Sequence, residues 1–256
     1  MSTSIEVTFT PAEFNALRER DLSETACVVF DVLRATTSMT VALANGAEAV
    51  IPVETIEDAV TIKNARPEVL LAGERDGLRI LAAQSGGIDF DLGNSPREYT
   101  EEAVSGRTIV STTTNGTRAL RACGGAKHTL IASMLNLRTV ANWLEAIEAK
   151  HVIMVCAGTH EEAAYEDMVG AGALCDIVWP QFVTGHIADS AEMARQIYRV
   201  MQRDLLSSMQ YSRNGRRLLA LPELAEDVRF CVQREILTVL GRMNSEGEVR
   251  LVQNEG

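Results

Sequence analysis

Short apolar runs alternate with longer amphipathic stretches along most of the chain. Residues 26–31 (ACVVFD), 49–53 (AVIPV) and 151–158 (HVIMVCAG) are almost continuously apolar. Residues 36–46 and 136–149, which lie between such runs, carry apolar side chains at helical spacing. Apolar strands connected by helices are typical of a parallel sheet that is covered on both faces. The pattern therefore predicts an α/β fold, a Rossmann-like three-layer sandwich with a largely parallel sheet.

Two segments of the chain share the same order of predicted elements. Residues 28–53 align with residues 107–132 at a shift of 79 residues. In each segment an apolar strand ends in a threonine cluster, a helix follows, and a Gly-Ala pair precedes a second strand. The identity is low, so chance similarity and an internal repeat both stay open. A repeat would give two similar α/β units that share a cleft within one region, residues 1–256.

Composition narrows the class of protein. Hydrophobic residues make up 46% of the chain and charged residues 23%, which is ordinary for a globular protein. No apolar run approaches the roughly 20 residues of a membrane span, and the first residues lack the features of a secretory signal. The five cysteines are widely spaced without a CxxC pair, which is typical of reduced thiols. We therefore expect a cytoplasmic protein without a membrane partner.

The net charge restricts the partners further. At −11, the charge disfavours nucleic-acid binding, because a phosphate backbone needs a basic face. A small anionic substrate remains compatible if arginines or a metal ion reverse the field locally. A compact α/β enzyme of this size is often a dimer, so a homodimer is an open expectation.

The segment RTIVSTTTNGTRAL, residues 107–120, places several hydroxyl groups between a predicted strand and a predicted helix. A helix cap would need only one of them. The alternative is an anion site, where hydroxyls and free backbone N–H groups converge on a phosphate-like group. Ligands of parallel sheets bind beyond the carboxyl ends of the strands, so a second threonine pair at residues 36–37 would face the same cleft. The candidate anion-binding residues of the two helix starts are Thr36, Thr37, Thr113, Thr114, Asn115, Gly116 and Thr117.

Asp31 and Arg34 directly follow the apolar strand predicted at residues 26–31. In the simplest interpretation, Asp31 caps the next helix and Arg34 pairs with a surface acid. In a functional interpretation, Asp31 binds a metal or acts as an acid, base or nucleophile, and Arg34 binds an oxyanion through its planar fork.

Two loops contribute further polar candidates. Glu74 and Arg75 lie in GERDG, residues 73–77, which reads equally well as a solvated turn. In the following DFDLGNSP segment, Asp89 and Asp91 share a face if the backbone is extended, an arrangement that suits a hard cation. The turn after them places Asn94 and Ser95 near the same edge, although Ser95 alone would also serve as a helix cap.

Glu166 and Asp167 are adjacent acids near a predicted helix start. On a helix their side chains diverge by about 100°, so both serve one cation only at the helix start or through a water. A solvated acidic helix face is the alternative. The nearby HEEAA string lacks the second histidine of a zinc-protease motif, and the chain contains no GxGxxG, P-loop or GxSxG motif.

Taken together and in order, these clusters resemble the 2-phosphosulfolactate phosphatases, magnesium-dependent enzymes first associated with coenzyme M biosynthesis. The resemblance spans roughly residues 26–235. It rests on DVLRATTS (31–38), GERDG (73–77), FDLGNSP (90–96), TTTNGTRAL (112–120), CAG (156–158), ED (166–167) and YSRNGRRL (211–218). Two departures, DGLRILAAQSGGI (76–88) and THEEAAYED (159–167), border the expected cleft and affect the substrate identity more than the reaction class.

The resemblance implies hydrolysis of the phosphate ester of a small 2-hydroxy acid, with (R)-2-phospho-3-sulfolactate as the first choice. Such a substrate carries a phosphate, a sulfonate and a carboxylate. Two helix starts together with Arg34 and Arg75 would suit the binding of these three anionic groups. The expected catalytic residues are Asp31, Arg34, Glu166 and Asp167. The further substrate-binding residues are Asn94 and Ser95. The expected Mg²⁺ ligands come from Asp31, Glu74, Asp91, Glu166 and Asp167.

Other functions stay open at this point. A non-catalytic small-anion binding protein would keep the threonines and arginines without needing clustered carboxylates. A phosphatase for another 2-phospho-hydroxy acid is equally compatible with the residues. An isomerase or lyase should show a general base at a strand end, and no histidine or lysine occupies such a position. The sequence leaves open whether water attacks directly or an aspartyl-phosphate forms.

Overall fold

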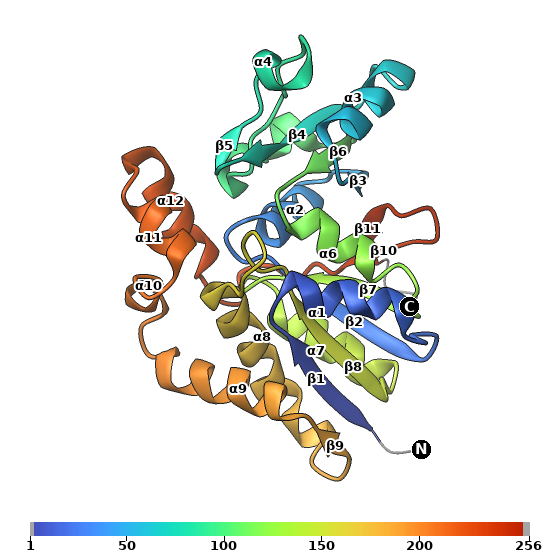
Figure 1. Cartoon of the computed structure of the whole chain (residues 1–256), viewed down its shortest axis with the longest axis vertical. Coiled ribbons are helices and arrows are strands. Elements are labelled where there is room, and N and C mark those ends of the chain that lie inside the picture. The colour runs from blue at the N-terminus through green and yellow to red at the C-terminus, as the bar shows by residue number, and fades with distance from the viewer. Residues whose placement is uncertain (1–2, 253–256) are drawn as a thin grey trace.

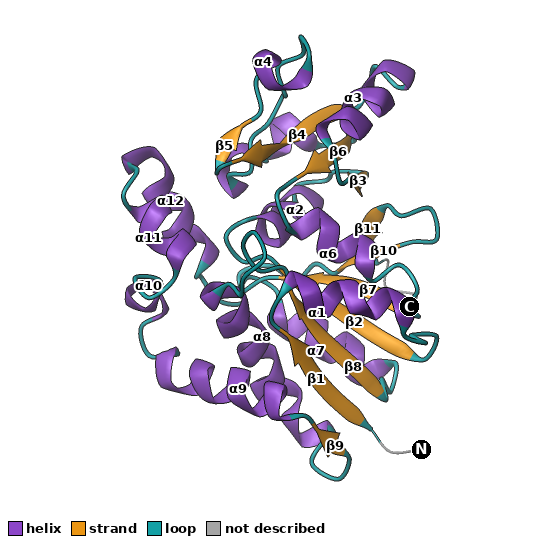
Figure 2. Ribbon diagram, in the orientation of Figure 1, coloured by secondary structure: helices purple, strands orange, loops and turns teal. Residues whose placement is uncertain are grey.

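The computed structural model describes residues 3–252, which form one large sheet with helices on both faces (Figure 1, Figure 2). The sheet has eleven strands in the order β5-β4-β6-β3-β11-β10-β7-β2-β8-β1-β9. The strands are β1 (Ser4–Thr8), β2 (Thr25–Phe30), β3 (Ala49–Pro52), β4 (Leu70–Arg75), β5 (Leu78–Arg79), β6 (Thr108–Thr112), β7 (His128–Ala132), β8 (His151–Cys156), β9 (His186–Ile187), β10 (Gly241–Met243) and β11 (Val249–Leu251).

Helices fill most of the connections between the strands. They are α1 (Pro11–Ala16), α2 (Ala35–Ala44), α3 (Ile56–Ala65), α4 (Ala82–Ser85), α5 (Glu101–Val104), α6 (Gly116–Ala122), α7 (Leu137–Ala146), α8 (Tyr165–Val178), α9 (Asp189–Met201), α10 (Leu205–Ser208), α11 (Arg213–Leu219) and α12 (Pro222–Cys231). Short 3₁₀ turns cover Leu17–Glu19, Pro96–Glu98 and Trp179–Gln181. The helix-rich stretch after residue 188 is α9 to α12. Among residues 3–252, no helix is both long and apolar enough to span a membrane.

The sheet consists of two parallel blocks that an antiparallel hairpin connects. In one block β4, β6 and β3 are parallel, and in the other β7, β2, β8 and β1 are parallel. The hairpin β10–β11 pairs antiparallel with β7 on one side and with β3 on the other. The predicted α/β fold with a largely parallel sheet is therefore confirmed.

The apolar runs are continuous because both faces of the strands are covered. In β2, Val28 and Phe30 pack with α7 and α8 on one face, whereas Cys27 and Val29 pack with α2 and α6 on the other. All six residues of β2 are buried. A strand with two covered faces has no solvent side for polar residues, so its sequence does not alternate.

The two segments of similar pattern cross between the blocks. In the first, β2 leads through α2 to β3; in the second, β6 leads through α6 to β7. The partners are reciprocal, because β3 pairs with β6 and β7 pairs with β2. Each segment thus begins in one block and ends in the other. Their origin as an internal repeat stays a prediction.

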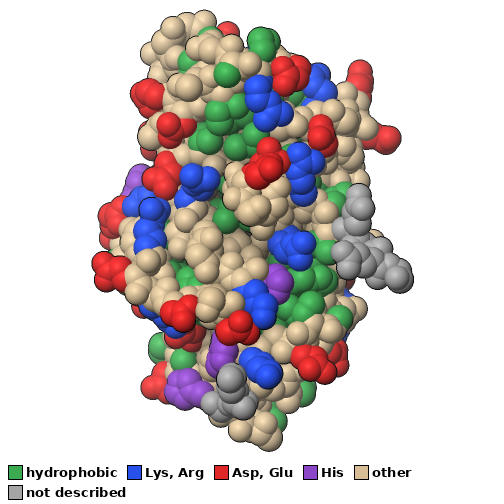
Figure 3. Space-filling view, turned by 90° about the vertical axis from the view of Figure 1, so that its right-hand side faces the viewer, with side chains coloured by type: hydrophobic (Ala, Val, Ile, Leu, Met, Phe, Trp, Pro, Cys, Tyr) green, Lys and Arg blue, Asp and Glu red, His purple; other side chains and the backbone are tan. Residues whose placement is uncertain are grey.

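Charged side chains are mixed over the surface. On the side that Figure 3 turns to the viewer, Lys and Arg side chains lie among Asp and Glu side chains, with small apolar areas between them. That side shows no extended basic area of the kind that binds a phosphate backbone.

Candidate active site

A pocket opens at the carboxyl ends of the parallel strands. β2, β4, β6 and β8 each contribute a loop to it, and α11 lies across from them. Its lining includes Asp31 after β2, Glu74 from β4, Asn115 before α6, Gly158 after β8 and Arg217 from α11. This is the edge at which open α/β sheets bind their ligands, because the helix starts and the connecting loops converge there.

Asp31 presents one carboxyl oxygen to the pocket. Its Oδ1 accepts a hydrogen bond from the N–H of Ala35 at 3.0 Å, which anchors the start of α2. Its Oδ2 has no hydrogen-bond partner within residues 3–252 and lies against Gly116, where an added Cβ would come within 2.5 Å of it. Burial raises the pKa of Asp31 to about 7, and the negative charges of Glu74 and Glu166 act in the same direction.

Arg34 is held by a carboxylate from the far end of the sequence. Its Nη1 donates to Asp227 Oδ2 at 2.6 Å, and its Nη2 donates to the carbonyl of Gly77 at 2.6 Å. The other oxygen of Asp227 accepts from the Ser95 hydroxyl at 2.7 Å. The Asp227 side chain is completely buried and that of Arg34 nearly so. The guanidinium is therefore fixed at the wall of the pocket.

Glu74 holds two loops of the pocket together. Its Oε1 accepts from both the N–H and the hydroxyl of Thr114, each at 2.9 Å. Its Oε2 accepts from the N–H of Gly77 at 2.6 Å. Both oxygens are thus engaged by the protein itself, and the GERDG segment is a turn that also forms a wall of the pocket.

Glu166 and Asp167 diverge at the start of α8, as adjacent residues at a helix start must. Asp167 accepts from the N–H of Val32 at 2.8 Å and from the N–H of Gly158 at 3.1 Å. Glu166 accepts from the Ser212 hydroxyl at 2.5 Å and from Asn214 Nδ2 at 2.6 Å. Burial, then the charges of Asp31 and Glu166, raise the pKa of Asp167 well above its usual 3.8. Both acids connect elements around the pocket.

Most threonines of the two helix starts bind backbone atoms. Thr36 donates to the carbonyl of Asp31 at 3.0 Å, and Thr37 donates to the carbonyl of Val32 at 2.9 Å. Thr117 donates to the carbonyl of Thr113 at 3.2 Å. These side chains are buried, and they shape the loops instead of lining the pocket. Of the predicted hydroxyl groups there, Thr114 is the one at the pocket wall.

Asn115 carries a buried acceptor without a partner. Its Nδ2 donates to the carbonyls of Ala157 at 3.0 Å and His160 at 2.9 Å, which fixes the orientation of the amide. Its Oδ1 is buried and has no hydrogen-bond partner among the described residues. An unpaired buried acceptor is costly, so this position favours a hydrogen-bond donor such as water, or a cation that the oxygen can coordinate.

Of three other predicted residues, one lies at the pocket and two do not. Asn94 lines the pocket, as expected. The structure does not bring Arg75 there, because its guanidinium folds back onto the carbonyl of Glu74 and the hydroxyl of Thr112. Asp91 also lies apart from the other acids. It accepts from the N–H of Leu71 at 2.8 Å, and Lys63 lies 3.9 Å from it, because the segment runs beside β4 and directs this side chain towards α3.

Sequence reasoning missed several residues of the pocket. Arg217 and Asn214 lie in YSRNGRRL, which supports the family resemblance but carries no interpretable spacing of its own. Asp227 was missed because it is one of several acids in α12, and only its burial distinguishes it. Of the unusual segments, Asp76 and Gly77 from residues 76–88 and Thr159 from residues 159–167 line the pocket.

The acids fit a cation that keeps most of its water. Within residues 3–252, no group of three or more His, Cys, Asp or Glu side chains is arranged as a metal cage. Glu74, Glu166 and Asp167 use both of their oxygens on protein donors, whereas Asp31 Oδ2 and Asn115 Oδ1 have no protein partner among the described residues. Magnesium binds through one or two protein oxygens and retains several waters, so this pair suits it better than calcium.

The fold and the pocket define an α/β protein with a polar ligand site at the carboxyl edge of its sheet. The sequence model of 2-phosphosulpholactate phosphatase matches residues 12–246. This chain therefore belongs to the 2-phosphosulfolactate phosphatase family, a family of phosphatases, and the resemblance found in the motifs is confirmed.

Curated relatives agree over nearly their whole length. A probable 2-phosphosulfolactate phosphatase of Caldanaerobacter subterraneus subsp. tengcongensis is 37% identical over 94% of this chain and 96% of its own. One of Symbiobacterium thermophilum is 38% identical over 91% of this chain and 97% of its own. One of Clostridium acetobutylicum is 33% identical over 91% and 95%, respectively.

Proposed function

We propose that this protein hydrolyses the phosphate ester of a small 2-hydroxy acid in a magnesium-dependent reaction, with (R)-2-phospho-3-sulfolactate as the preferred substrate. Family membership supports the reaction class. The observation that carries the proposal is the position of Asp31, whose free Oδ2 lies next to the start of α6 in a pocket that also contains Arg34. A carboxylate beside donors for a phosphate is an arrangement that suits metal-assisted ester hydrolysis.

Asp31 Oδ2 would hold magnesium, and Asn115 Oδ1 would be a second acceptor for the hydrated ion. When bound, the ion withdraws charge from the phosphate oxygens and lowers the pKa of a water ligand. The remaining acids would act indirectly. Asp167 fixes the loops after β2 and β8, and Glu74 fixes the loop before α6. These contacts would therefore hold Asp31 in position whether its carboxyl group is protonated or ionised.

The pocket supplies donors for the substrate oxygens. Arg34 contributes a planar guanidinium whose orientation the buried Asp227 and the Gly77 carbonyl determine. Gly116 has no Cβ, which allows Asp31 Oδ2 to lie against the start of α6. Donors that are fixed before the substrate arrives need no rearrangement as charge shifts within the transferred phosphoryl group.

A binding protein without turnover is the alternative function. It would explain the arginines and the helix starts, but it gives no reason to bury Asp31 with its Oδ2 free among other acids. Such a position costs stability, because desolvation and like charges both disfavour the carboxylate. Sites that keep such a group are frequently catalytic or metal-binding.

The experiment is a phosphate-release assay with purified protein. (R)-2-phospho-3-sulfolactate, 2-phospholactate and glycerol 2-phosphate are each supplied with Mg²⁺ or with a chelator. We expect release from phosphosulfolactate that the chelator abolishes. Release from 2-phospholactate alone would keep the reaction and discard the sulfonate. Calorimetric binding of phosphosulfolactate without release from any ester would instead support the binding protein.

A further inference from the structure

Two guanidinium groups lie beside Gly77 in the turn after β4. An added Cβ on Gly77 would lie 3.8 Å from Arg217 Nη2 and 3.9 Å from Arg34 Nη2. Arg34 comes from the loop after β2, whereas Arg217 comes from α11, far along the chain. Both side chains line the pocket. Two positive charges beside one turn favour compensating acids or an anionic ligand.

The two arginines differ in how their charge is balanced. Asp227 pairs with Arg34 at 2.6 Å, and neither side chain is reached by solvent to any extent. Arg217 lies 4.0 Å from its nearest carboxylate, that of Asp76, whose side chain is 80% exposed. A distant and hydrated partner compensates little charge. Arg217 therefore adds net positive charge to the pocket of a protein whose total charge is −11.

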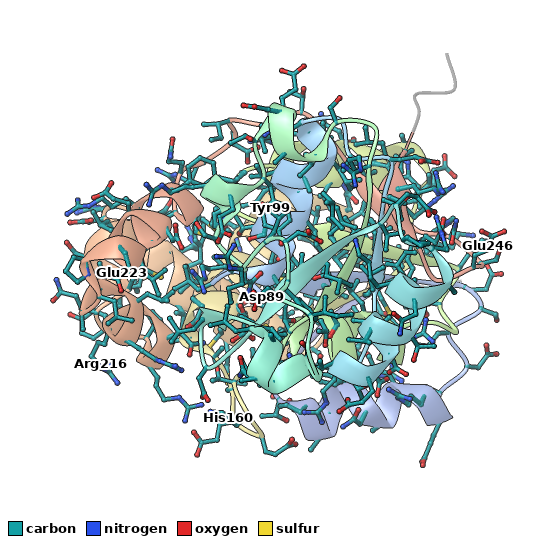
Figure 4. All side chains as sticks on the ribbon, turned by 90° about the horizontal axis from the view of Figure 1, so that it is seen from above. Asp89, Tyr99, His160, Arg216, Glu223 and Glu246 are labelled. Atoms are coloured by element: carbon teal, nitrogen blue, oxygen red, sulfur yellow. The ribbon has the colours of Figure 1, made fainter. Side chains whose placement is uncertain are left out.

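All three arginines of α11 bind protein acceptors, and Arg217 Nη2 donates to the carbonyl of Asp76. Arg213 donates to Glu162 at 2.7 Å and to the carbonyl of Thr159 at 2.8 Å. Arg216 donates to the carbonyls of Gln210 and Tyr211, each at 3.0 Å, and it lies at the outer edge of the molecule (Figure 4). Of these three arginines, Arg217 lines the pocket.

We propose that Arg217, together with Arg34, forms an anion subsite for the oxyacid group of the substrate that is not hydrolysed. This inference rests on the proposed phosphatase function, and it names the residue that sets the substrate class. The phosphate ester lies at Asp31 and the start of α6, while the second anionic group reaches the turn at Gly77. A planar fork of N–H donors suits a carboxylate or a sulfonate equally well. The pocket thereby prefers esters with an additional anion.

The test compares two neighbouring arginines, Arg217→Gln and Arg216→Gln. Sulfolactate, which retains both acid groups after hydrolysis, is titrated calorimetrically into each variant and into the wild type. Loss of a charged hydrogen bond predicts about 10- to 100-fold weaker binding for Arg217→Gln. Arg216→Gln should bind as the wild type does, and Arg217→Lys should lie between the two because it retains the charge without the fork. Equal affinities in the wild type and Arg217→Gln would overturn the proposal.

Kinetics separate this proposal from the phosphatase function. For phosphosulfolactate, Arg217→Gln should raise KM by a similar factor of about 10 to 100 while kcat changes little. For glycerol 2-phosphate, which has no second anion, the kcat/KM values of the two proteins should agree. If the wild type turns over phosphosulfolactate and Arg217→Gln has the same KM as the wild type, the subsite is refuted and the phosphatase function stands. Arg217-dependent sulfolactate binding without any turnover supports the subsite and refutes the phosphatase.

Discussion

Arg34 and Asp227 form a buried ion pair with 2.6 Å between Nη1 and Oδ2, and they join the loop after β2 to the C-terminal helix α12. The pair connects parts of the chain that are 193 positions apart. Because both groups are withdrawn from water, neither tolerates loss of its partner. The C-terminal helices are therefore part of the pocket wall, not an appendage to the sheet.

Asp227→Asn should destabilise the protein by about 3–5 kcal/mol, since it leaves the Arg34 charge buried without a counter-charge. The free energy of unfolding in urea measures the effect. The control is Asp176→Asn, which removes the partner of Arg195 in a pair at 2.8 Å whose side chains are partly exposed. That pair should contribute only about 1 kcal/mol or less. Similar losses in both variants would contradict the special role of the Arg34–Asp227 pair.

Gly116→Ala should reduce phosphate release by about 100-fold, because the new Cβ would lie 2.5 Å from Asp31 Oδ2 and 2.8 Å from the Ala35 Cβ. The collision displaces Asp31 from its position beside α6. Gly125→Ala, where the added Cβ meets nothing within 4 Å, is the matched control and should retain activity. Initial rates at saturating substrate measure both variants. An active Gly116→Ala enzyme would show that the position of Asp31 is not critical.

The stability of the metal-free protein should depend on pH through Asp31. The pKa of this group is raised from 3.8 to about 7, so the folded protein retains a proton that the unfolded chain has lost in that range. The contribution of Asp31 to stability is thus fully present below about pH 3.8 and is lost as the pH rises towards 7. Urea unfolding with a chelator, from pH 4 to pH 8, measures it. Relative to Asp31→Asn, the wild type should lose stability across that range; parallel curves would be evidence against the shift.

Magnesium should stabilise the wild type against thermal unfolding, since a ligand at about 100 times its Kd adds about 2.7 kcal/mol. Asp31→Asn should lose this response, because it removes the unengaged carboxyl oxygen. Asp91→Asn should retain it, since Asp91 contacts the Leu71 N–H away from the pocket. The change in Tm with and without Mg²⁺ compares the three proteins. A response lost in Asp91→Asn and kept in Asp31→Asn would reverse the proposed metal site.

The fold was predictable from the sequence wherever strands are buried on both faces. The six buried residues of β2 give an unbroken apolar run, and Asp31 stands out because it ends that run. The hairpin β10–β11 was not predicted, because its strands, GRM and VRL, are three residues long and partly polar. These short polar strands form because they pair with β7 and β3. Such long-range pairing cannot be predicted from the local sequence pattern.

The site residues that come directly after predicted strands, or end them, could be predicted from the sequence. Asp31, Glu74, Thr114 and Asn115 follow or end apolar runs and do line the pocket. Arg217 comes from a helix that reaches the pocket only through tertiary packing. The hydrogen-bonding capacity of Thr36, Thr37 and Thr117 was visible in the sequence, but its direction towards backbone carbonyls was not.

Single-turnover release of phosphate from (R)-2-phospho-3-sulfolactate, by wild type and Asp31→Asn with Mg²⁺, tests the phosphatase assignment most directly. We predict release by the wild type and a rate at least about 100-fold lower for Asp31→Asn, with both proteins folded. Equal rates in the two proteins would contradict the central role of Asp31. Bound but intact substrate in the wild type would contradict the assignment itself.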